Sequence, residues 1–481
     1  MKRKRILTFV IALVFTLAVF LAPIGYLVGS VLSIEPQYSK TLYGELNEKY
    51  DRLRSLRGEQ KIVIIGGSSV AFGIDSAMIE KYTSLPVVNF GLYAALGTKL
   101  MLDLSRSSIG KGDIVILAPE ADAQTLSLYF SSLHTLRALD DEPGMARELS
   151  VSERFSLIAA MWDLLAEKRG YRDRGTPDPE GVYNSGNFNE YGDMIYPRRE
   201  NIMAGYADEN SPLDLSPDIL SDDFSEYLND YISYCESRGA TVYFSYCPMN
   251  ELALTDAARD GGVYDFDRHM RENIKCEFIT DISSSVMNGG YFYDSNFHLN
   301  DYGVTAHTVS LLRDLLLAMG IPRKVEETVP EPPPLVKNDY TFDGTDENEV
   351  YFTYEHLASG GYRITGLSDL GLRQRELTLP IGTNGEYIVS LGSGAFSGSE
   401  VLTVRIPAGT RLNISNGAFD SSKITDIWIY EPDPTVISPP RPFADRQITV
   451  HIPRGSGYRT DYFWSEVGIS SGSWREDAGG D

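Results

Sequence analysis

The chain has 481 residues, which is too long for one ordinary domain and predicts two or three. Its formal charge of −24 at pH 7 argues against nucleic-acid binding, because that function requires a basic surface. The three cysteines are odd in number and share no CxxC spacing, which excludes a disulfide-stabilised scaffold.

The N-terminus predicts a membrane anchor. A basic cluster, residues 2–5, precedes an uncharged stretch, residues 6–34, that exceeds the roughly 20 apolar residues of a membrane-spanning helix. Basic flanks stay in the cytoplasm, so residues 1–34 are predicted to be a cytoplasmic tip and a transmembrane signal anchor. We therefore expect a single-pass cell-membrane protein with most of the chain outside the cell. A long cleaved signal peptide is the alternative.

Polar and charged residues 35–60 predict a short stalk, and residues 61–322 predict an α/β domain. Apolar strand patterns alternate there with helical patterns, as in a parallel sheet with crossover helices. Strands are expected at 61–67, 85–91, 113–120, 240–248 and 276–280. Helices are expected to begin near residue 76 and to cover 122–138, 150–168, 222–238 and 301–319. A polar segment rich in glycine and tyrosine, residues 170–215, interrupts the alternation and is here called the insert.

Consecutive prolines predict a stiff, extended linker over residues 323–345. Beyond it, residues 346–481 predict a repeat domain. Two Gly-Ala-Phe copies begin at Gly394 and Gly417, a spacing of 417 − 394 = 23 residues, and short strand patterns such as "LTVRIP" lie beside them. A period of this length with one short strand per unit indicates a solenoid, in which neighbouring repeats bury each other's apolar faces.

The stretch "IVIIGGSSVAFGID", residues 62–75, places paired serines where the first strand turns into a helix. Open α/β sheets bind ligands at the carboxyl ends of their strands, and amides at a helix start can stabilise an oxyanion. Taken alone, the stretch also fits an ordinary strand-to-helix turn. A direct alignment of "GGSS" favours Ser68 as a nucleophile, whereas counting back from Gly73 favours Ser69.

A second stretch, "YFYDSNFHLNDYG", places Asp294 and His298 immediately before the last predicted helix. A serine nucleophile requires a base, and the base requires an acid that orients it. These two residues can supply both roles. The alternative is a capped helix start with a surface histidine.

Together the two stretches resemble the SGNH (GDSL-like) hydrolase superfamily over roughly residues 61–320. "GGSS" stands where that family has Gly-Asp-Ser, and "DSNFH" resembles its D-x-x-H block with one extra residue. The "DSNFHLNDYG" end most resembles membrane-anchored members that handle acyl groups on cell-surface polymers. The resemblance implies a flavodoxin-like three-layer α/β/α sandwich, with Ser68 as nucleophile, His298 as base and Asp294 as orienting acid.

The resemblance also implies oxyanion donors, and here the chain departs from the family pattern. Gly91 and Ala94 lie where the second block supplies a backbone amide, and Glu120 in "LAPEAD" stands near the place of the third block's asparagine. Asn187 and Asn189 of the insert are candidate substitutes for that asparagine. A carboxylate beside the nucleophile would disfavour an oxyanion, which keeps an inactive site as an alternative.

The C-terminal stretches "LTVRIPAGT", "ISNGAFDSSKITDIWIY" and "ITVHIPRGSGYRTDYFW" resemble BspA-like leucine-rich repeats of bacterial surface proteins. The sequence as a whole predicts a membrane-anchored serine esterase or O-acyltransferase that acts on cell-surface polysaccharide or teichoic acid. The alternative is an inactive surface protein that binds polymers or proteins through its repeats. The expected partners are an acyl ester or polymer substrate, the membrane, and a membrane acyltransferase or another protein. No cofactor and no metal are expected.

Overall fold

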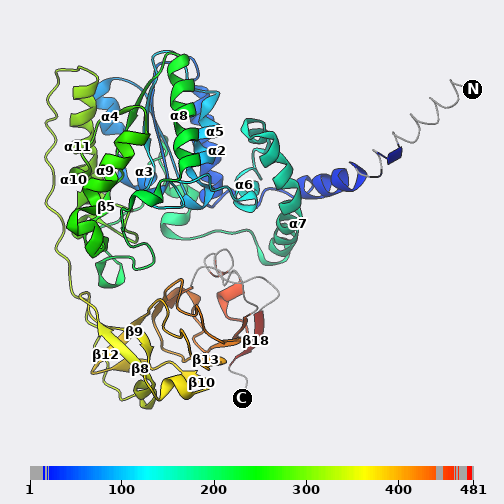
Figure 1. Ribbon diagram of the computed structural model, residues 1–481. Helices are drawn as coiled ribbons and strands as arrows, with labels where there is room; N and C mark the ends of the chain where they lie inside the picture. The colour runs from blue at the N-terminus through cyan, green and yellow to red at the C-terminus, as the bar shows by residue number, and fades with distance from the viewer. Residues whose placement is uncertain are drawn as a thin grey trace, which may run out of the picture.

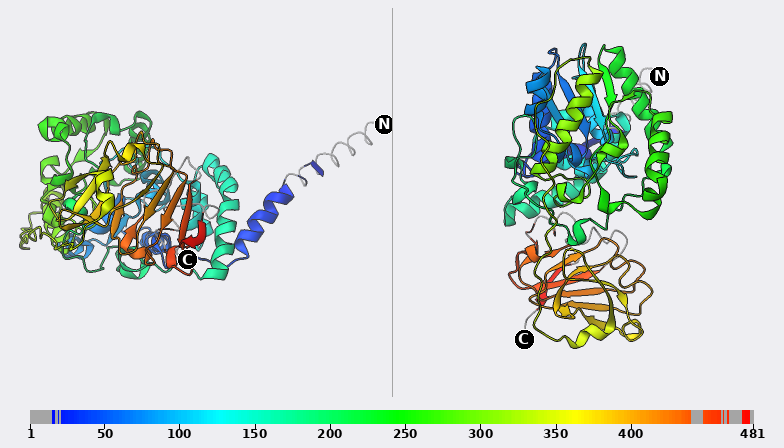
Figure 2. Two further views of the ribbon diagram at one scale, coloured as in Figure 1. Left: turned by 90° about the horizontal axis from the view of Figure 1, so that it is seen from below. Right: turned by 90° about the vertical axis from the view of Figure 1, so that its left-hand side faces the viewer.

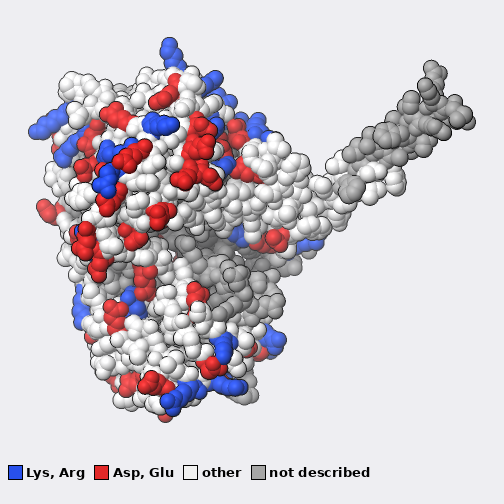
Figure 3. Space-filling view, viewed as in Figure 1, with Lys and Arg blue, Asp and Glu red and all other residues white. Residues whose placement is uncertain are grey.

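The computed structural model describes residues 15–16, 19, 21–439, 448–459, 461, 464 and 474–478, and only the backbone of residues 172–174. An α/β domain and a repeat domain of mostly parallel strands lie one above the other in Figures 1 and 2. A helix at residues 21–32 extends away from the α/β domain (Figure 1). In the face drawn in Figure 3, acidic and basic side chains are interspersed over both domains.

The predicted membrane span, residues 6–34, lies partly outside the described residues. Within the described part of the chain, every helix falls short of the length or the apolar content that a bilayer crossing demands.

A five-stranded parallel sheet forms the centre of the α/β domain, which confirms the predicted fold class of α/β with parallel strands. In spatial order its strands are β2 (Val87–Gly91), β1 (Ile62–Gly66), β3 (Ile114–Ala118), β4 (Thr241–Phe244) and β6 (Glu277–Phe278). The chain passes from β1 outward to β2 and then crosses back to β3. In doubly wound sheets, ligands bind beyond the carboxyl ends of the strands at such a reversal.

Both faces of the sheet are buried, which explains why its strands are continuous apolar runs. Val63 and Ile65 belong to the core beneath α2, α5 and α8, whereas Ile62 and Ile64 face the core beneath α4 and α11. The helices are α2 (Leu42–Ser55), α3 (Ser68–Gly73), α4 (Ser76–Thr83), α5 (Thr98–Arg106), α6 (Ser132–Ala138), α7 (Val151–Arg174), α8 (Asp222–Ser237), α9 (Val263–Asn273), α10 (Ile282–Ser285) and α11 (Asp301–Ala318). A separate short ladder pairs β5 (Met249–Asn250) with β7 (Val286–Met287).

Two helical expectations differ from the structure. The helix expected at 122–138 begins only at Ser132, because the Asp122 side chain accepts the N–H groups of Gln124 and Thr125 and holds that stretch in a turn. The helix expected at 150–168 continues to Arg174.

The segment predicted as a stalk, residues 35–60, packs into the α/β domain instead. Helix α2 contacts β2, and its apolar side chains lie in the main core. The pattern of buried residues in α2 is difficult to recognise in the sequence because it includes two charged side chains, Glu45 and Lys49. The large buried apolar residues of α2 are Leu42, Tyr43, Leu46, Tyr50 and Leu53.

The repeat domain has two sheets with their own core. One sheet contains β10 (Glu376–Thr378), β13 (Thr403–Ile406), β15 (Asp426–Ile429), β17 (Thr449–Pro453) and β18 (Trp474–Ala478). The other contains β8 (Phe352–His356), β9 (Tyr362–Leu367), β12 (Glu386–Leu391), β14 (Leu412–Ile414) and β16 (Ile437–Ser438), with β11 (Gly382–Thr383) beside β12.

The register of the repeat strands shows the period seen in the sequence. Thr403 pairs with Asp426, which pairs with Thr449, so successive partners are 426 − 403 = 23 residues apart. The Gly-Ala-Phe motif is a core element, because Phe396 and Phe419 are buried and stacked with their ring centroids 5.6 Å apart.

The proline-rich segment follows the α/β domain rather than standing free. Tyr291 donates a hydrogen bond to the carbonyl of Pro330 at 2.7 Å, and Lys81 pairs with Glu327 at 2.5 Å. In Figure 1 the segment runs from the end of α11 along the side of the domain to the repeats.

The position of α2 predicts where a stable fragment begins. A fragment of residues 35–325 should unfold cooperatively, whereas one of residues 61–325 should not. Losing the five apolar side chains of α2, at about 2–5 kcal/mol for each large buried residue, would exceed the typical stability of a domain. Thermal unfolding followed by circular dichroism compares the two. Equal, cooperative transitions in both fragments would show that α2 is dispensable.

Candidate active site

Ser68 stands at the carboxyl end of the central strand. Strand β1 ends at Gly66, Gly67 is the N-cap of α3, and Ser68 is the first residue of that short helix. The Ser68 Oγ atom lies 2.7 Å from Nε2 of His298, which is 230 residues away in the chain. The side chain is partly exposed, so a substrate can reach it.

His298 and Asp294 share the loop that precedes α11. Nδ1 of His298 lies 2.8 Å from Oδ1 of Asp294. The loop is pinned at its ends, because Tyr293 N–H donates to the carbonyl of His298 and Asn300 caps α11 by accepting the N–H groups of its first turn. The structure thus joins Ser68, His298 and Asp294 in one hydrogen-bonded chain.

Two further side chains, absent from the sequence prediction, fix the imidazole plane. The Phe72 ring stacks on His298 with a centroid distance of 4.0 Å, and the Arg198 guanidinium lies 5.0 Å from the centre of the Phe72 ring. Burial lowers the pKa of Arg198 to about 10. Phe72 belongs to the "SSVAFG" stretch, where an aromatic residue one helical turn after the serine is the signal that could have found it.

Ser69 occupies a different position from Ser68. Its hydroxyl is buried and makes no hydrogen bond within the described part of the chain, while its backbone N–H donates to Oε1 of Glu120 at 2.7 Å. Of the two serines considered from the sequence, Ser68 is therefore the one in contact with His298.

Glu120 follows β3 and reaches the same serine. Its Oε1 lies 2.8 Å from Ser68 Oγ, and burial, reinforced by the charge of Asp122, raises the pKa of this carboxyl. Gly67 makes the approach feasible, because a Cβ atom at that position would lie 2.8 Å from Oε1.

The two candidates for a backbone-amide donor, Gly91 and Ala94, lie at and just after the end of β2, the strand next to β1. Gly91 N–H faces Oδ1 of Asn89 at 3.3 Å, and a Cβ on Gly91 would lie 2.6 Å from the carbonyl of Gly67. Ala94 starts a 3₁₀ turn, and its carbonyl accepts the side-chain amide of Gln124.

The insert asparagines do not replace the missing oxyanion donor. The Asn187 amide donates to the carbonyl of Gly181 at 2.6 Å, and the Asn189 amide faces Asp193. Both side-chain amides thus form hydrogen bonds within the insert. The spacing of residues in the sequence does not predict these bonds. The expectation that one of them serves Ser68 is therefore not met.

Asn296, between the acid and the base, was not singled out from the sequence although it lies inside "DSNFH". It is fully buried, its amide donates to the carbonyls of Asp208 and Ser211, and its Oδ1 accepts Asp208 N–H. The loop that carries Asp294 and His298 is thereby tied to residues 208–211 of the insert.

The same part of the insert contacts the repeat domain. Glu209 pairs with Arg363 of β9 at 2.7 Å and also contacts Ser415, and Asn210 accepts the N–H of Asn416 at 2.8 Å. The repeat domain is thus connected to the Asp294–His298 loop through two residues of the insert and Asn296.

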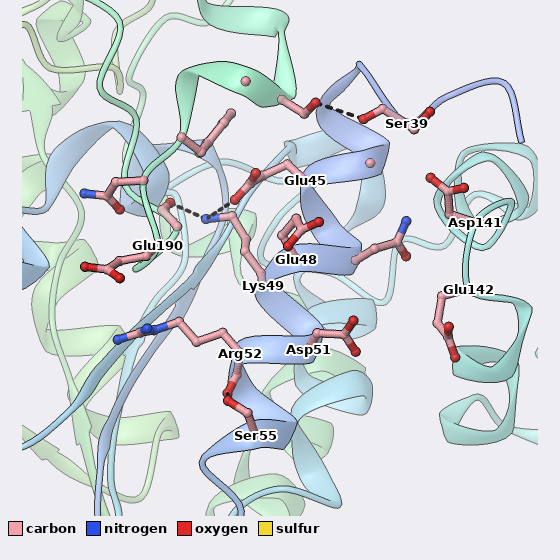
Figure 4. A pocket seen from close by; sticks show the side chains of 17 residues that line it. Ser39, Glu45, Glu48, Lys49, Asp51, Arg52, Ser55, Asp141, Glu142 and Glu190 are labelled. Carbon is pink, nitrogen blue, oxygen red and sulfur yellow. Dashed lines mark hydrogen bonds and ion pairs between the residues drawn. The ribbon is translucent and has the colours of Figure 1, made fainter.

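A pocket of about 960 Å³ lies elsewhere, between α2 and the insert (Figure 4). Burial raises the pKa of Glu45 to about 8 and lowers the pKa of Lys49 to about 8. Of the predicted site residues, only Asn189 lines this pocket. Its acidic lining residues are Glu45, Glu48, Asp51, Asp141, Glu142 and Glu190.

Among the described residues, no three His, Cys, Asp or Glu side chains are grouped as a metal site. No protein-family model matches the chain, and no curated protein matches it. The function is therefore inferred from the geometry of the site.

Proposed function

We propose that the chain is an SGNH-type serine acyl esterase or O-acyltransferase. The observation that carries the proposal is the hydrogen-bonded series Ser68–His298–Asp294 at the carboxyl edge of a parallel sheet. Nucleophile, base and orienting acid stand in the order that acyl transfer requires, and each link is within hydrogen-bond length.

The chemistry follows from these contacts. Ser68 Oγ attacks the acyl carbonyl carbon and its proton passes to Nε2 of His298, while the Asp294 carboxylate stabilises the imidazolium that forms. The carbonyl oxygen becomes an oxyanion. When the bond to the leaving alcohol breaks, His298 returns the proton to that alcohol. Water or an acceptor hydroxyl then releases the acyl group from Ser68 by the same steps.

The surroundings of the site support a large substrate. The carboxyl edge of the sheet, with α3 and the start of α11, is the edge nearer to the repeat domain in Figure 1. A polymer bound along the repeats, which resemble BspA-like leucine-rich repeats, would pass close to Ser68. We therefore propose an acylated cell-surface polysaccharide or teichoic acid as substrate, with a membrane acyltransferase or another protein as a partner.

One contact favours the second candidate function, an inactive surface protein that works through its repeats. An ionised Glu120 at 2.8 Å from Ser68 Oγ would oppose the negative charge of an oxyanion. The protonation of this one carboxyl separates the two candidates.

The triad predicts the outcome of single substitutions. Ser68→Ala and His298→Ala should each lower kcat for a small acyl ester by about 10⁴-fold or more, with unchanged circular dichroism. Because the residues act as a unit, the double variant should be little worse than either single one. Turnover that survives in Ser68→Ala but is lost in Ser69→Ala would move the nucleophile by one residue, and turnover in both would refute the serine mechanism.

Anchoring and orientation are also part of the proposal. The basic residues 2–5 before an apolar run predict that a reporter enzyme fused to the C-terminus is active only outside the cytoplasm. The reporter should stay in the membrane fraction of the cells. A reporter active in the cytoplasm would reverse the orientation, and a secreted, shortened product would show that the segment is a cleaved signal.

A further inference from the structure

We propose that Glu120 works as a neutral carboxylic acid that donates a hydrogen bond toward Ser68, and that the site is active only while this carboxyl holds its proton. The inference rests on the proposed acyl-transfer function and adds a residue role and a pH dependence to it.

Counting protons at Ser68 leads to this conclusion. A serine hydroxyl has one hydrogen to donate, and Ser68 Oγ has two close partners, His298 Nε2 at 2.7 Å and Glu120 Oε1 at 2.8 Å. Attack requires that the hydrogen points to His298. The contact with Glu120 then needs a hydrogen from the other side, and only a protonated carboxyl can supply it.

An ionised Glu120 would instead take the serine hydrogen. A carboxylate is solely an acceptor, so it would compete with His298 for the proton of Ser68 or place two oxygen lone pairs against each other. The backbone N–H of Ser69 donates to the same Oε1 atom and is compatible with either form.

The surroundings of Glu120 favour the neutral form. The side chain is 3% exposed, and the titratable groups that face it are Asp122 after β3, Cys247 after β4 and His298 before α11. Burial and Asp122 raise the pKa of Glu120, while His298 and the hydrogen bonds from the two serines lower it less. Buried carboxylic acids in such surroundings can act as neutral hydrogen-bond donors.

The neutral carboxyl of Glu120 can also act as the oxyanion donor, the role that the family pattern gives to an asparagine near this position. When Ser68 Oγ bonds to the acyl carbon, the carbonyl electron pair moves to oxygen, and the Glu120 O–H can donate to that oxyanion. Glu120 keeps its proton throughout, since the proton of Ser68 travels to His298 and then to the leaving alcohol.

Glu120→Gln tests the proposal, because glutamine is nearly isosteric and cannot ionise, while its amide oxygen can still accept the N–H of Ser69 that Oε1 accepts in the wild type. The wild-type protein should lose kcat/KM by about tenfold per pH unit on the alkaline side, and this alkaline loss should be absent in Glu120→Gln. Glu45→Gln removes another buried carboxyl, remote from Ser68, and should keep the wild-type profile. Difference infrared spectroscopy of the wild type should show a protonated-carboxyl band that Glu120→Gln removes.

Identical alkaline profiles in the wild type and Glu120→Gln would overturn the role of Glu120 while leaving the hydrolase intact. A wild-type spectrum that lacks the protonated-carboxyl band would overturn it as well, whatever the turnover of Glu120→Gln. If neither protein turns over an acyl ester or is labelled at Ser68 by a phosphonate at any pH, the proposed function itself fails.

A different surface carries a second inference: we infer that one face of α7 lies in the lipid bilayer beside the predicted anchor. Val151, Phe155 and Trp162 are 63%, 67% and 57% exposed, and their spacing puts them on one helical face. Leu157 and Leu164, on the opposite side, pack into the core. Large apolar side chains in one exposed stripe mark an interaction surface.

The position of α7 indicates a membrane as the occupant. Lys168 of α7 donates to the carbonyl of Ile34, and the Tyr171 ring contacts Tyr38, so α7 packs on the chain just after the predicted span. In Figures 1 and 2, α7 crosses the base of the N-terminal helix at the side toward which that helix extends. Much of the surface over α7 carries no charged side chain in Figure 3. An amphipathic helix at this place can bury its apolar face among lipid acyl chains.

Quenching of tryptophan fluorescence tests this inference, which rests on the predicted anchor. The full chain is reconstituted in phosphatidylcholine and phosphatidylglycerol vesicles with brominated acyl chains. The brominated lipid should quench part of the tryptophan fluorescence of the wild type, and this quenched part should be missing in Trp162→Phe. Trp428→Phe, in the repeat domain, should leave the amount of quenched fluorescence unchanged. If the protein stays in the membrane during carbonate extraction but Trp162 is not quenched, the lipid contact of α7 is wrong and the anchor stands. If carbonate removes the protein from the membrane and Trp162 is not quenched, both the lipid contact and the anchor are wrong.

Discussion

Close approach of three backbones at the carboxyl edge of the sheet is the constraint on which the site depends. Gly66 of β1 pairs with Gly91 of β2 and Ala118 of β3, and a Cβ on either glycine would collide with neighbouring backbone or with Val70. Because all three residues are small, α3 begins directly over the strand ends. Ser68 therefore contacts His298, which lies 230 residues later in the chain.

The repeat domain takes part in this arrangement through the insert. Glu209 contacts side chains of the repeats, and its neighbour Asp208 is held by Asn296 inside the loop of the acid and the base. Side-chain contacts of Glu209, its peptide bond to Asp208 and the hydrogen bonds of Asp208 therefore link the repeats to Asn296, two residues before His298. This gives the polar insert a structural purpose that its composition alone does not suggest.

The sequence predicted the features that depend on local pattern and missed those that depend on distant partners. Buried strands are apolar runs, and the stretches around Ser68 and His298 lie at strand and helix ends, so both could be found. The charges of α2, such as Lys49, predict an exposed stalk, although the Lys49 amine is buried against the carbonyl of Asn89. The stacking of Phe72 and the bonds of Asn296 join segments whose proximity exists only after folding.

Gly67 and Glu120, the two positions near Ser68 that differ from the SGNH pattern that the sequence resembles, face each other. The family has an acid in the residue before the serine, whereas here that residue is Gly67 and the acid is Glu120. A Cβ atom at position 67 would lie 2.8 Å from Oε1 of Glu120, so glycine in the turn leaves room for an acid that arrives from β3. The carboxyl then faces Ser68 from inside the protein, away from water, where burial favours its neutral form.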